Sequence, residues 1–568
     1  MMRKRTKMLA GLLAAVLAAG TLTGCGGSGS EGSGSSDKKD AGGEKVFNCS
    51  TGSVIVGLNP ILDTSAPDNE AHNLICDALV RSVKAENNTS EIIPAGAETW
   101  DISDDGLTYT FHLHKDAKWS DGEPLRAQDY EYTLKLMADP ETAATNAWLF
   151  DGVIENFGEA LYDDGKKPED IAVKAVDDNT LEIKIIHPAS YFLELASSIY
   201  PVRQDKYEEW GEAYGSSADK IICSGPFEVD SWSQNTEFVV KRNENYWDAE
   251  NVKLDKIVQK VIQEPATAVQ AFINQEIDRV STSDPNWVSQ IEAAGISRTE
   301  VVPDSAPQFL MFNQKNEYLS NTKIRQALSA SFDRQEFVDT LRDGQAFPIY
   351  SVMPDTMLIG ETPYTELVDG KNYFVKQLQD EVKDPKALLE EGLKELGKPA
   401  DASQVTIRYA SRGTNELSKK MAEWYKQTWE TNLGIHVEID MMEWNVMWEK
   451  IDAGDYDVAV GGWGPYYNEP SAILMLFDPE NGYFNAEKMG WDNEDSKKFK
   501  ELCDSAVNIV DEKEKAEIYL QAEELLVYNA VIAPEYLEQS PIYIANTVKN
   551  HPMSTNGMEN WAAVDVEK

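Results

Sequence analysis

Hydrophobic and polar positions alternate along most of the chain, with two different periods. Residues 107–114 alternate one by one, as in a half-buried strand, whereas residues 129–137 have apolar side chains at helical spacing. The same patterns predict further strands at 181–186, 238–242, 257–261, 405–409, 437–440 and 457–460. They predict further helices at 323–334, 386–396 and 416–431. Strands and helices that alternate in this way indicate an α/β protein with more than one sheet.

The N-terminus has a different pattern, in which a basic start precedes an apolar run. Four basic residues lie within the first seven positions, and residues 8–19 are all apolar or small. This run is shorter than the roughly 20 residues that a helix needs to span a bilayer. We therefore expect residues 1–24 to be a removable export signal, and a short membrane anchor is the alternative.

The end of this signal, LTGC at residues 22–25, resembles the lipobox of bacterial lipoproteins. The resemblance implies cleavage before Cys25 and acylation of its thiol, which would anchor the protein at the outer face of the cytoplasmic membrane, on the cell surface. Residues 25–43 are rich in glycine and serine and have almost no apolar side chains. Such a segment cannot bury enough surface to fold, so we expect a flexible tether.

Composition and charge limit the function classes. The chain has 568 residues, 42% of them hydrophobic and 10% aromatic, so it can fill several domain cores. No segment after the signal has 18 consecutive apolar residues, and we expect a soluble body. The formal net charge of −45 argues against nucleic acid and anionic membrane surfaces as partners.

The sequence contains no enzyme motif. It lacks H-E-x-x-H, G-x-S-x-G and the glycine-rich phosphate-binding loops. His112 and His114 share one face of a predicted strand and form a possible metal pair, but no third ligand lies nearby and we favour a solvated face. We therefore expect no enzymatic activity, no metal and no cofactor.

Four cysteines follow Cys25 at wide spacing, without a C-x-x-C motif: Cys49, Cys76, Cys223 and Cys503. In an exported chain they allow two disulfides in any of three pairings. Buried small thiols are the equal alternative, and the spacing leaves both open.

An aromatic and glycine-rich segment follows the strand predicted at 457–460. Residues 461–470 read GGWGPYYNEP, which leaves little room for a packed element. The aromatic side chains would then face a cleft at the C-terminal end of that strand. A structural turn with buried aromatic residues is the alternative.

Four stretches occur in an order that is specific. They are FHLHKDAKWSDGEP at 111–124; SGPF at 224–227 with Trp232 and RNENYW at 242–247; IRQALSASFDR at 324–334; and YDV at 456–458 leading to GW at 462–463 and NEP at 468–470. Together they resemble the family of oligopeptide-, dipeptide- and nickel-binding proteins of ABC importers. The last stretch is especially similar to the oligopeptide-binding branch.

The resemblance implies a two-lobed periplasmic-binding-protein fold, with hinged lobes and an extra third domain in the first lobe. The main domain of the first lobe would comprise residues 44–75, 202–305 and 533–568. The extra domain would be 76–201, and the second lobe 306–532. Closure of the lobes would bury the ligand.

The resemblance also implies a set of ligand-binding residues. In peptide binders of this family, an extended peptide pairs with strands of the protein through main-chain hydrogen bonds. Thr64, Ser65 and Ala66 occupy the first-lobe segment of this kind, and Trp463 and Gly464 the second-lobe segment. Asn146 and Tyr466 complete the expected site.

Tyr466 departs from the family pattern, because peptide binders usually have an aspartate there that pairs with the ligand's α-ammonium group. Two arginines of the enteric oligopeptide binder also fall on Val460 and Ile451. Glu469 is a candidate substitute, although N-E-P in this family favours a structural role for it.

We therefore expect a lipid-anchored, extracytoplasmic receptor that captures oligopeptides or peptide-like solutes and delivers them to an ABC transporter permease. We expect a monomer whose only membrane contact is its lipid anchor. One alternative keeps the receptor role for an oligosaccharide, whose rings would stack on Trp463, Tyr466 and Tyr467. Another is a sensing or adhesion lipoprotein that serves no importer.

Overall fold

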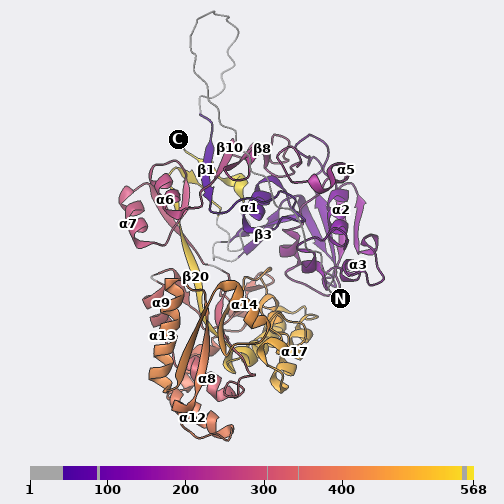
Figure 1. The fold of residues 1–568 in the computed structure, drawn as a ribbon. Coiled ribbons are helices and arrows are strands. Elements are labelled where there is room, and N and C mark those ends of the chain that lie inside the picture. The colour runs from indigo at the N-terminus through magenta and orange to yellow at the C-terminus, as the bar shows by residue number, and fades with distance from the viewer. Residues whose placement is uncertain (1–42, 86–89, 304, 343, 553–559, 568) are drawn as a thin grey trace, which may run out of the picture. The chain divides into compact units, whose positions relative to one another are not determined.

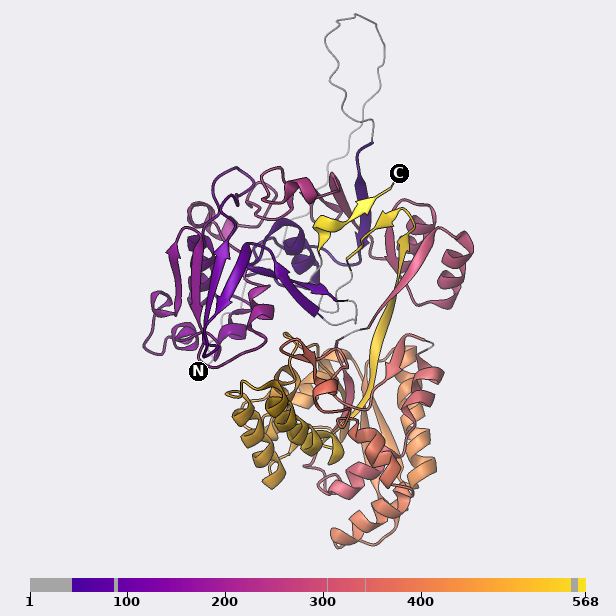
Figure 2. The ribbon, with the colours of Figure 1, turned by 180° about the vertical axis from the view of Figure 1, so that it is seen from behind.

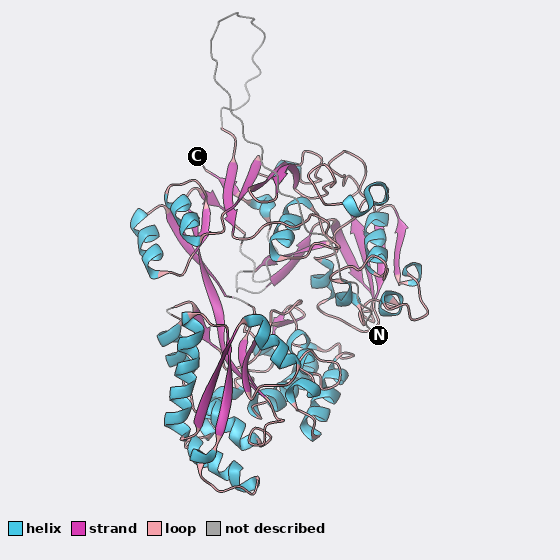
Figure 3. Cartoon of the chain, viewed as in Figure 1, coloured by secondary structure: helices cyan, strands magenta, loops and turns pink. Residues whose placement is uncertain are grey.

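The computed structural model of the protein describes residues 43–85, 90–303, 305–342, 344–552 and 560–567. The predicted export signal, Cys25 and most of the predicted tether lie outside these residues. Strands and helices alternate along the described chain, as the hydrophobic pattern predicts (Figure 3). In the described parts, no helix combines the length and the apolar character that crossing a membrane requires.

The first sheet joins segments that are far apart in the sequence. Its strand order is β1 (Val46–Thr51), β10 (Lys256–Val261), β9 (Glu237–Arg242) and β8 (Phe227–Ser233). β1 runs parallel to β10, while the other neighbours are antiparallel. Helix α1 (Ala66–Ile75) packs against β8. This sheet therefore brings β1 next to residues 227–261, about 200 positions later in the chain.

A second four-stranded sheet lies within residues 97–184. It has the order β4 (Ala97–Ile102), β5 (Thr108–Leu113), β7 (Thr180–Lys184) and β6 (Val173–Asp177), and all pairs are antiparallel. Helix α2 (Ala127–Met137) covers it. A hairpin of β2 (Val80–Lys84) and β3 (Ser90–Pro94) precedes it. Buried residues of both sheets form one hydrophobic core.

The third sheet is built around one long strand, β20 (Ile532–Ala545). Its first half pairs with β13 (Gln308–Phe312) and β14 (Ala346–Pro348), and its second half with β11 (Arg279–Ser281) and β12 (Ser297–Pro303). β19 (Val458–Gly462), β17 (Thr406–Arg412) and β18 (His436–Met442) follow β13 in the order of the sheet. β20 runs from the part that holds α9 and α13 to the part that holds α6 and α7 (Figures 1 and 2).

Helices cover both faces of this sheet and produce separate cores. One core includes Phe309, Met311 and Ile532, and the other includes Leu310, Phe312 and Ala533, since neighbouring residues of a strand point to opposite faces. A smaller core lies between α6 and α7. The remaining helices are α3 (Phe157–Leu161), α4 (Phe192–Ala196), α5 (Gln204–Trp210), α6 (Pro265–Ile273), α7 (Pro285–Ala294), α8 (Thr322–Ala330), α9 (Arg334–Leu341), α10 (Tyr364–Leu367), α11 (Phe374–Glu381), α12 (Pro385–Glu395), α13 (Glu416–Leu433), α14 (Trp444–Asp452), α15 (Ser471–Leu474), α16 (Ala486–Met489), α17 (Glu494–Ala506) and α18 (Glu512–Glu523). Two short antiparallel pairs complete the strands: β15 (Leu358–Ile359) with β16 (Thr362–Pro363), and β21 (Val548–Lys549) with β22 (Asp565–Val566).

One predicted helix proves to be two. The periodicity at 323–334 predicts a continuous helix, but α8 ends at Ala330 and α9 begins at Arg334. Asp333 accepts hydrogen bonds from the main-chain N–H groups of Gln335 and Glu336, at 2.8 and 3.0 Å. An aspartate in this position favours a helix start over helix continuation, so the cap divides the segment.

Candidate functional site

The first predicted segment, Thr64 to Ala66, forms the start of α1. Ser65 is the N-cap, and its main-chain N–H and its hydroxyl both donate to the Asp68 carboxylate, at 3.2 and 2.5 Å. The Thr64 carbonyl accepts from the Asn69 side chain at 3.1 Å. The main-chain N–H groups of Thr64 and Ala66 have no acceptor among the described residues. Ser65 and Ala66 are exposed. The N–H groups of Thr64 and Ala66 are therefore the unused main-chain donors of this segment.

Asp68 holds the Thr64–Ala66 segment in place through its hydrogen bonds. Its side chain is buried, and its second oxygen accepts from the N–H of Val56 at 2.7 Å. One carboxylate therefore holds the preceding loop and the helix start together. A buried carboxylate that accepts several hydrogen bonds rigidifies the backbone around it.

Asn146 lies beside this segment, although it belongs to the region after α2. Its neighbour Thr145 donates from its main-chain N–H to the Ile61 carbonyl at 3.1 Å and from its hydroxyl to the Leu62 carbonyl at 2.8 Å. Asn146 begins the short helical turn of residues 147–150 and is half-buried. That turn presents Trp148, a residue that is 46% exposed.

The second predicted segment, Trp463 and Gly464, follows β19 directly. Gly462 is the last residue of β19 and pairs with Gln308 on β13. Beyond this pair, the main-chain groups of Trp463 and Gly464 make no hydrogen bond within the described chain. Trp463 is half-buried and packs at 5.1 Å against the ring of Tyr483. Gly464 is exposed, so a supported ring adjoins an open stretch of main chain.

Tyr466 is exposed and in contact with the helical turn of residues 147–150. The residue is 52% exposed, and its ring meets the ring of Trp148 edge to face, with 4.8 Å between ring centroids. The structure thus brings Tyr466 next to the turn that Asn146 begins. Between Thr64–Ala66 and Trp463–Tyr466 themselves, the described residues form no hydrogen bond or ring contact.

Glu469 has a structural role and is no substitute for the missing aspartate. It is buried and accepts from Ser190 Oγ at 2.5 Å, from the Tyr519 hydroxyl at 2.8 Å and from Ser471 Oγ at 3.3 Å. Lys515 Nζ lies 3.7 Å from the same carboxylate. A carboxylate that is buried with this many partners is not available to a ligand ammonium group.

The residues around Glu469 tie the loop to the region of residues 90–194. The Asn468 main-chain N–H donates to Glu194 at 2.6 Å, and its side chain donates to Ser90 Oγ at 3.2 Å. The rings of Tyr467 and Tyr191 stack with centroids 4.0 Å apart. A cavity of about 490 Å³ lies beside this junction, lined by residues of both regions that include Trp148, Tyr191, Tyr467 and Lys515. Sequence reasoning missed Ser190, Tyr191 and Glu194, because no local motif marks their contact with residues almost 300 positions later.

Two other positions of the family comparison are apolar core residues here. Val460 and Ile451 are fully buried, each in one of the cores that flank the third sheet. A different arginine, Arg412, lies half-buried at the end of β17. Sequence reasoning did not identify it.

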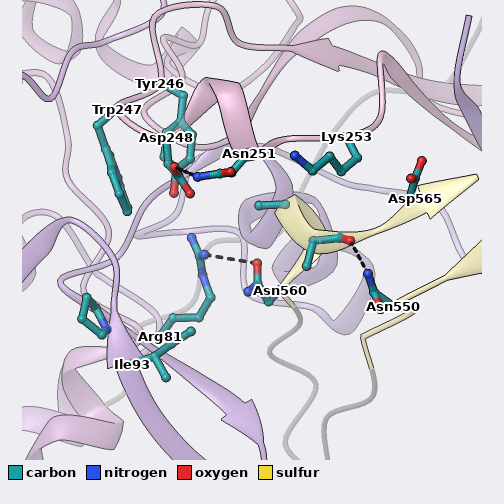
Figure 4. Close-up of a pocket in the computed structure, with 13 residues that line it drawn as sticks. Arg81, Ile93, Tyr246, Trp247, Asp248, Asn251, Lys253, Asn550, Asn560 and Asp565 are labelled. Carbon is teal, nitrogen blue, oxygen red and sulfur yellow. Dashed lines mark hydrogen bonds between the residues drawn. The ribbon is translucent and has the colours of Figure 1, made fainter. Parts of the chain in front are cut away.

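A second cavity, of about 370 Å³, lies away from these segments (Figure 4). Arg81 forms an ion pair with Asp77 at 2.7 Å and donates to Asn560 at 3.4 Å. Burial alone would lower the pKa of Arg81, but Tyr246 and Asp77 outweigh it and raise that pKa. Trp247 donates to Asp77 at 2.8 Å. None of the predicted site residues lines this cavity, whose polar groups largely satisfy one another.

The histidines and cysteines form no metal site in the described residues. His112 contacts Asp101 at 2.9 Å, whereas the ring of His114 stacks on Trp247 at 3.7 Å. Cys49, Cys76, Cys223 and Cys503 are all buried, and no disulfide joins the last three. Burial raises the pKa of the Cys223 thiol to about 12. The structure therefore favours buried thiols, one of the two alternatives that the sequence left open.

Comparison with known proteins identifies the family. Residues 91–485 match the bacterial extracellular solute-binding proteins, family 5 Middle. The chain is 30% identical over 526 residues to the oligopeptide-binding protein OppA of Bacillus subtilis, covering 90% of each chain. It is also 30% identical over 576 residues to the dipeptide-binding protein DppE of the same species, covering 98% of this chain and 99% of the relative.

Solved structures agree with these sequence comparisons. Listeria monocytogenes OppA, solved with bound peptide, is 28% identical and superposes with a TM-score of 0.68 over 93% of this chain and all of the other. The murein tripeptide binding protein MppA of Escherichia coli, 23% identical, shares the fold with a TM-score of 0.70 over 93% of this chain and 99% of the other.

The chain belongs to the bacterial extracellular solute-binding proteins of family 5. The predicted family is confirmed, and so is the predicted multi-domain periplasmic-binding-protein fold. Because proteins of this family bind solutes, the expectation that the chain is not an enzyme is also confirmed.

Proposed function

We propose that the protein captures oligopeptides and delivers them to the permease of an ABC importer. The observation that carries this proposal is the open main chain of Trp463 and Gly464, directly after a paired strand. An extended peptide can extend this pairing, since all peptides present the same N–H and C=O groups. Two relatives of similar length are named for oligopeptide and dipeptide binding, which supports the same ligand class.

The peptide would lie between two sets of donors. The N–H groups of Thr64 and Ala66 would donate to peptide carbonyls on one side, and those of Trp463 and Gly464 on the other. Asn146, Trp463 and Tyr466 would then contact side chains of the ligand. Because main-chain groups provide the common contacts, this arrangement tolerates many peptide sequences, with water filling unused space.

The domain division belongs to the same proposal. The main domain of the first lobe would comprise 44–75, 202–305 and 533–568, the extra domain 76–201, and the second lobe 306–532. The separate hydrophobic cores on either side of residues 305–308 support the division between the two lobes. Movement of the second lobe about β20 and β12 would close the site over the peptide.

Attachment to the membrane through Cys25 completes the proposal. Lipid chains on Cys25 would hold the protein outside the cytoplasmic membrane as a monomer, while residues 26–43 would let the body reach the permease. Two or more acyl chains are needed for stable anchoring, because one alone binds membranes only marginally.

Native mass spectrometry tests the ligand class. The purified protein without its signal would be mixed with an equimolar pool of tri- to pentapeptides and, separately, with oligosaccharides of similar mass. We expect retention of peptides and no retention of sugars. Retention of sugars alone would replace this proposal with an oligosaccharide receptor, and retention of neither would contradict both.

A further inference from the structure

An unpaired cation lies at one end of the open segment. The Arg412 guanidinium donates to the side-chain oxygen of Gln308 and lies 4.6 Å above the ring of Trp444. Trp444 is 43% exposed. Among the described residues, no carboxylate forms an ion pair with Arg412. An arginine stacked on an aromatic ring keeps its outer N–H groups available for a carboxylate.

Glu535, a buried acid whose pKa responds to Arg412, does not form an ion pair with it. Burial raises the pKa of Glu535 to about 8, even though Arg334 and Arg412 lower it. Neither of its oxygens has a hydrogen-bond partner within the described parts of the chain. At neutral pH the raised pKa of Glu535 favours its uncharged form, which does not pair with the Arg412 guanidinium.

Arg412 is placed at the start of the segment that would pair with a peptide. Its partner Gln308 is the residue opposite Gly462 in the sheet. A Cβ atom on Gly462 would lie 2.5 Å from the Gln308 oxygen, so this side chain rests on the Gly462 backbone. From Gly462 to Tyr466 the chain can reach at most about 14 Å, which is the length of roughly four extended peptide residues.

The other end of the segment has aromatic rings, and the acids found near it among the described residues are already engaged. Tyr466 and Trp148 meet there, each about half exposed. Three described acidic side chains of this region have partners: Glu469 with Ser190, Ser471 and Tyr519; Glu194 with Asn468 and Ser90; and Asp151 with Tyr162. An ammonium group placed here would be partly desolvated without a carboxylate, and contact with the ring faces offsets only part of that cost.

We propose that the site selects short peptides by this asymmetry. Arg412, supported by Trp444 and Gln308, holds the free carboxylate of the ligand, while Tyr466 and Trp148 pack against an uncharged amino end. The preferred class is then a peptide of about four residues with a blocked amino terminus, for example N-acylated. This inference rests on the proposed peptide-binding function.

Isothermal titration calorimetry with four forms of one tetrapeptide tests it. The peptide would carry either a free or an acetylated amino end, combined with either a free or an amidated carboxyl end. We expect the acetylated peptide with a free carboxylate to bind most tightly. Loss of either feature should weaken binding about 10- to 100-fold, the range for one charge-assisted hydrogen bond.

Variants separate the two ends of the ligand. Arg412→Met keeps the aliphatic stem and should abolish the preference for the carboxylate over the amide, while leaving the preference for acetylation. Tyr466→Asp should reverse the preference at the amino end in favour of the free amine, and Tyr466→Phe should retain the original preference. Arg408→Met is the matched control, because Arg408 lies on the same strand but pairs with Asp455 at 3.2 Å.

The outcomes are distinguishable. If wild-type protein binds all four forms equally, or prefers the free amine, this inference is wrong and the peptide-binding function stands. If Arg412→Met discriminates carboxylate from amide as wild type does, Arg412 is not the anchor. If wild type binds none of the four, the proposed function fails together with this inference. Thermal unfolding of each variant checks that it is folded.

Discussion

The two segments proposed to pair with a peptide differ in how far the protein itself uses their polar groups. Ser65 directs its N–H and its hydroxyl to Asp68, so the first segment is a helix cap with two spare donors. The main-chain groups of Trp463 and Gly464 make no hydrogen bond with the described residues. The first segment is thus rigid and partly used, whereas the second is open.

The buried acids near the two segments also differ in how many hydrogen bonds their carboxyl oxygens accept. Asp68 accepts from Val56 and Ser65, whereas both oxygens of Glu535 lack a hydrogen-bond partner in the described residues. The contrast teaches that burial alone does not define a site. An acid that holds a backbone in place is structural, and an unsatisfied one changes the charge balance around it.

Removing Asp68 should have the largest effect. Asp68→Ala leaves three donors on Val56 and Ser65 without their acceptor, and we expect a loss of roughly 2–4 kcal/mol in the free energy of unfolding. Urea denaturation measures it. Asn69→Ala, on the exposed side of the same helix, is the control and should cost less than about 1 kcal/mol. Equal losses in the two variants would contradict the role of Asp68.

Closing the open main chain should remove ligand binding without unfolding the protein. Gly464→Pro deletes one N–H donor, and we expect peptide affinity to fall about 10- to 100-fold because a ligand carbonyl loses its partner. Calorimetric titration gives the affinity. Gly464→Ala is the matched control, since its Cβ would lie 3.9 Å from Ala306, an ordinary contact. If the proline variant binds as well as the alanine variant, the Gly464 N–H is not part of the site.

Glu535 should make stability depend on pH. Its folded pKa of about 8 lies above the ordinary value of 4.5, so the stability it contributes is complete below about 4.5 and is lost as pH rises towards 8. Glu535→Gln should remove up to about 1.4 kcal/mol per pH unit from this slope and should be more stable than wild type at pH 8. Urea denaturation between pH 5 and pH 8.5 checks it, and parallel slopes for the two proteins would argue against a protonated Glu535.

Ser65→Ala should have the smallest effect. The variant loses the hydroxyl contact to Asp68 but keeps the main-chain one, and we expect a loss of about 1 kcal/mol in stability. Peptide affinity should change less than twofold, because the groups proposed to pair with the ligand are main-chain groups. A tenfold weaker affinity would mean that the hydroxyl itself contacts the peptide.

The sequence predicts the elements of the fold well where one local signal dominates. The strict alternation at 107–114 predicts β5, and the helical spacing at 386–396 predicts α12. The pattern at 323–334 misleads, because a cap at Asp333 outweighs the apolar periodicity. The pairing of β1 with β10, 210 positions apart, has no local signal at all.

The candidate site follows the same rule. The glycines and prolines after β19 predict an open stretch, and the structure has one at Trp463 and Gly464. The contacts of Glu469 with Ser190 and of Tyr466 with Trp148 join distant parts of the chain, so they depend on tertiary packing. Arg412 was missed for the same reason: its position beside Gly462 arises through Gln308 on another strand.

Hydrogen–deuterium exchange at the two segments tests the central claim most directly. A tetrapeptide that native mass spectra show to be retained would be added at saturation, and exchange would be followed for fragments covering 64–66 and 463–464. We predict slower exchange, by tenfold or more, at the amides of Thr64, Ala66, Trp463 and Gly464. Unchanged exchange at Trp463 and Gly464, with the peptide demonstrably bound, would contradict the account.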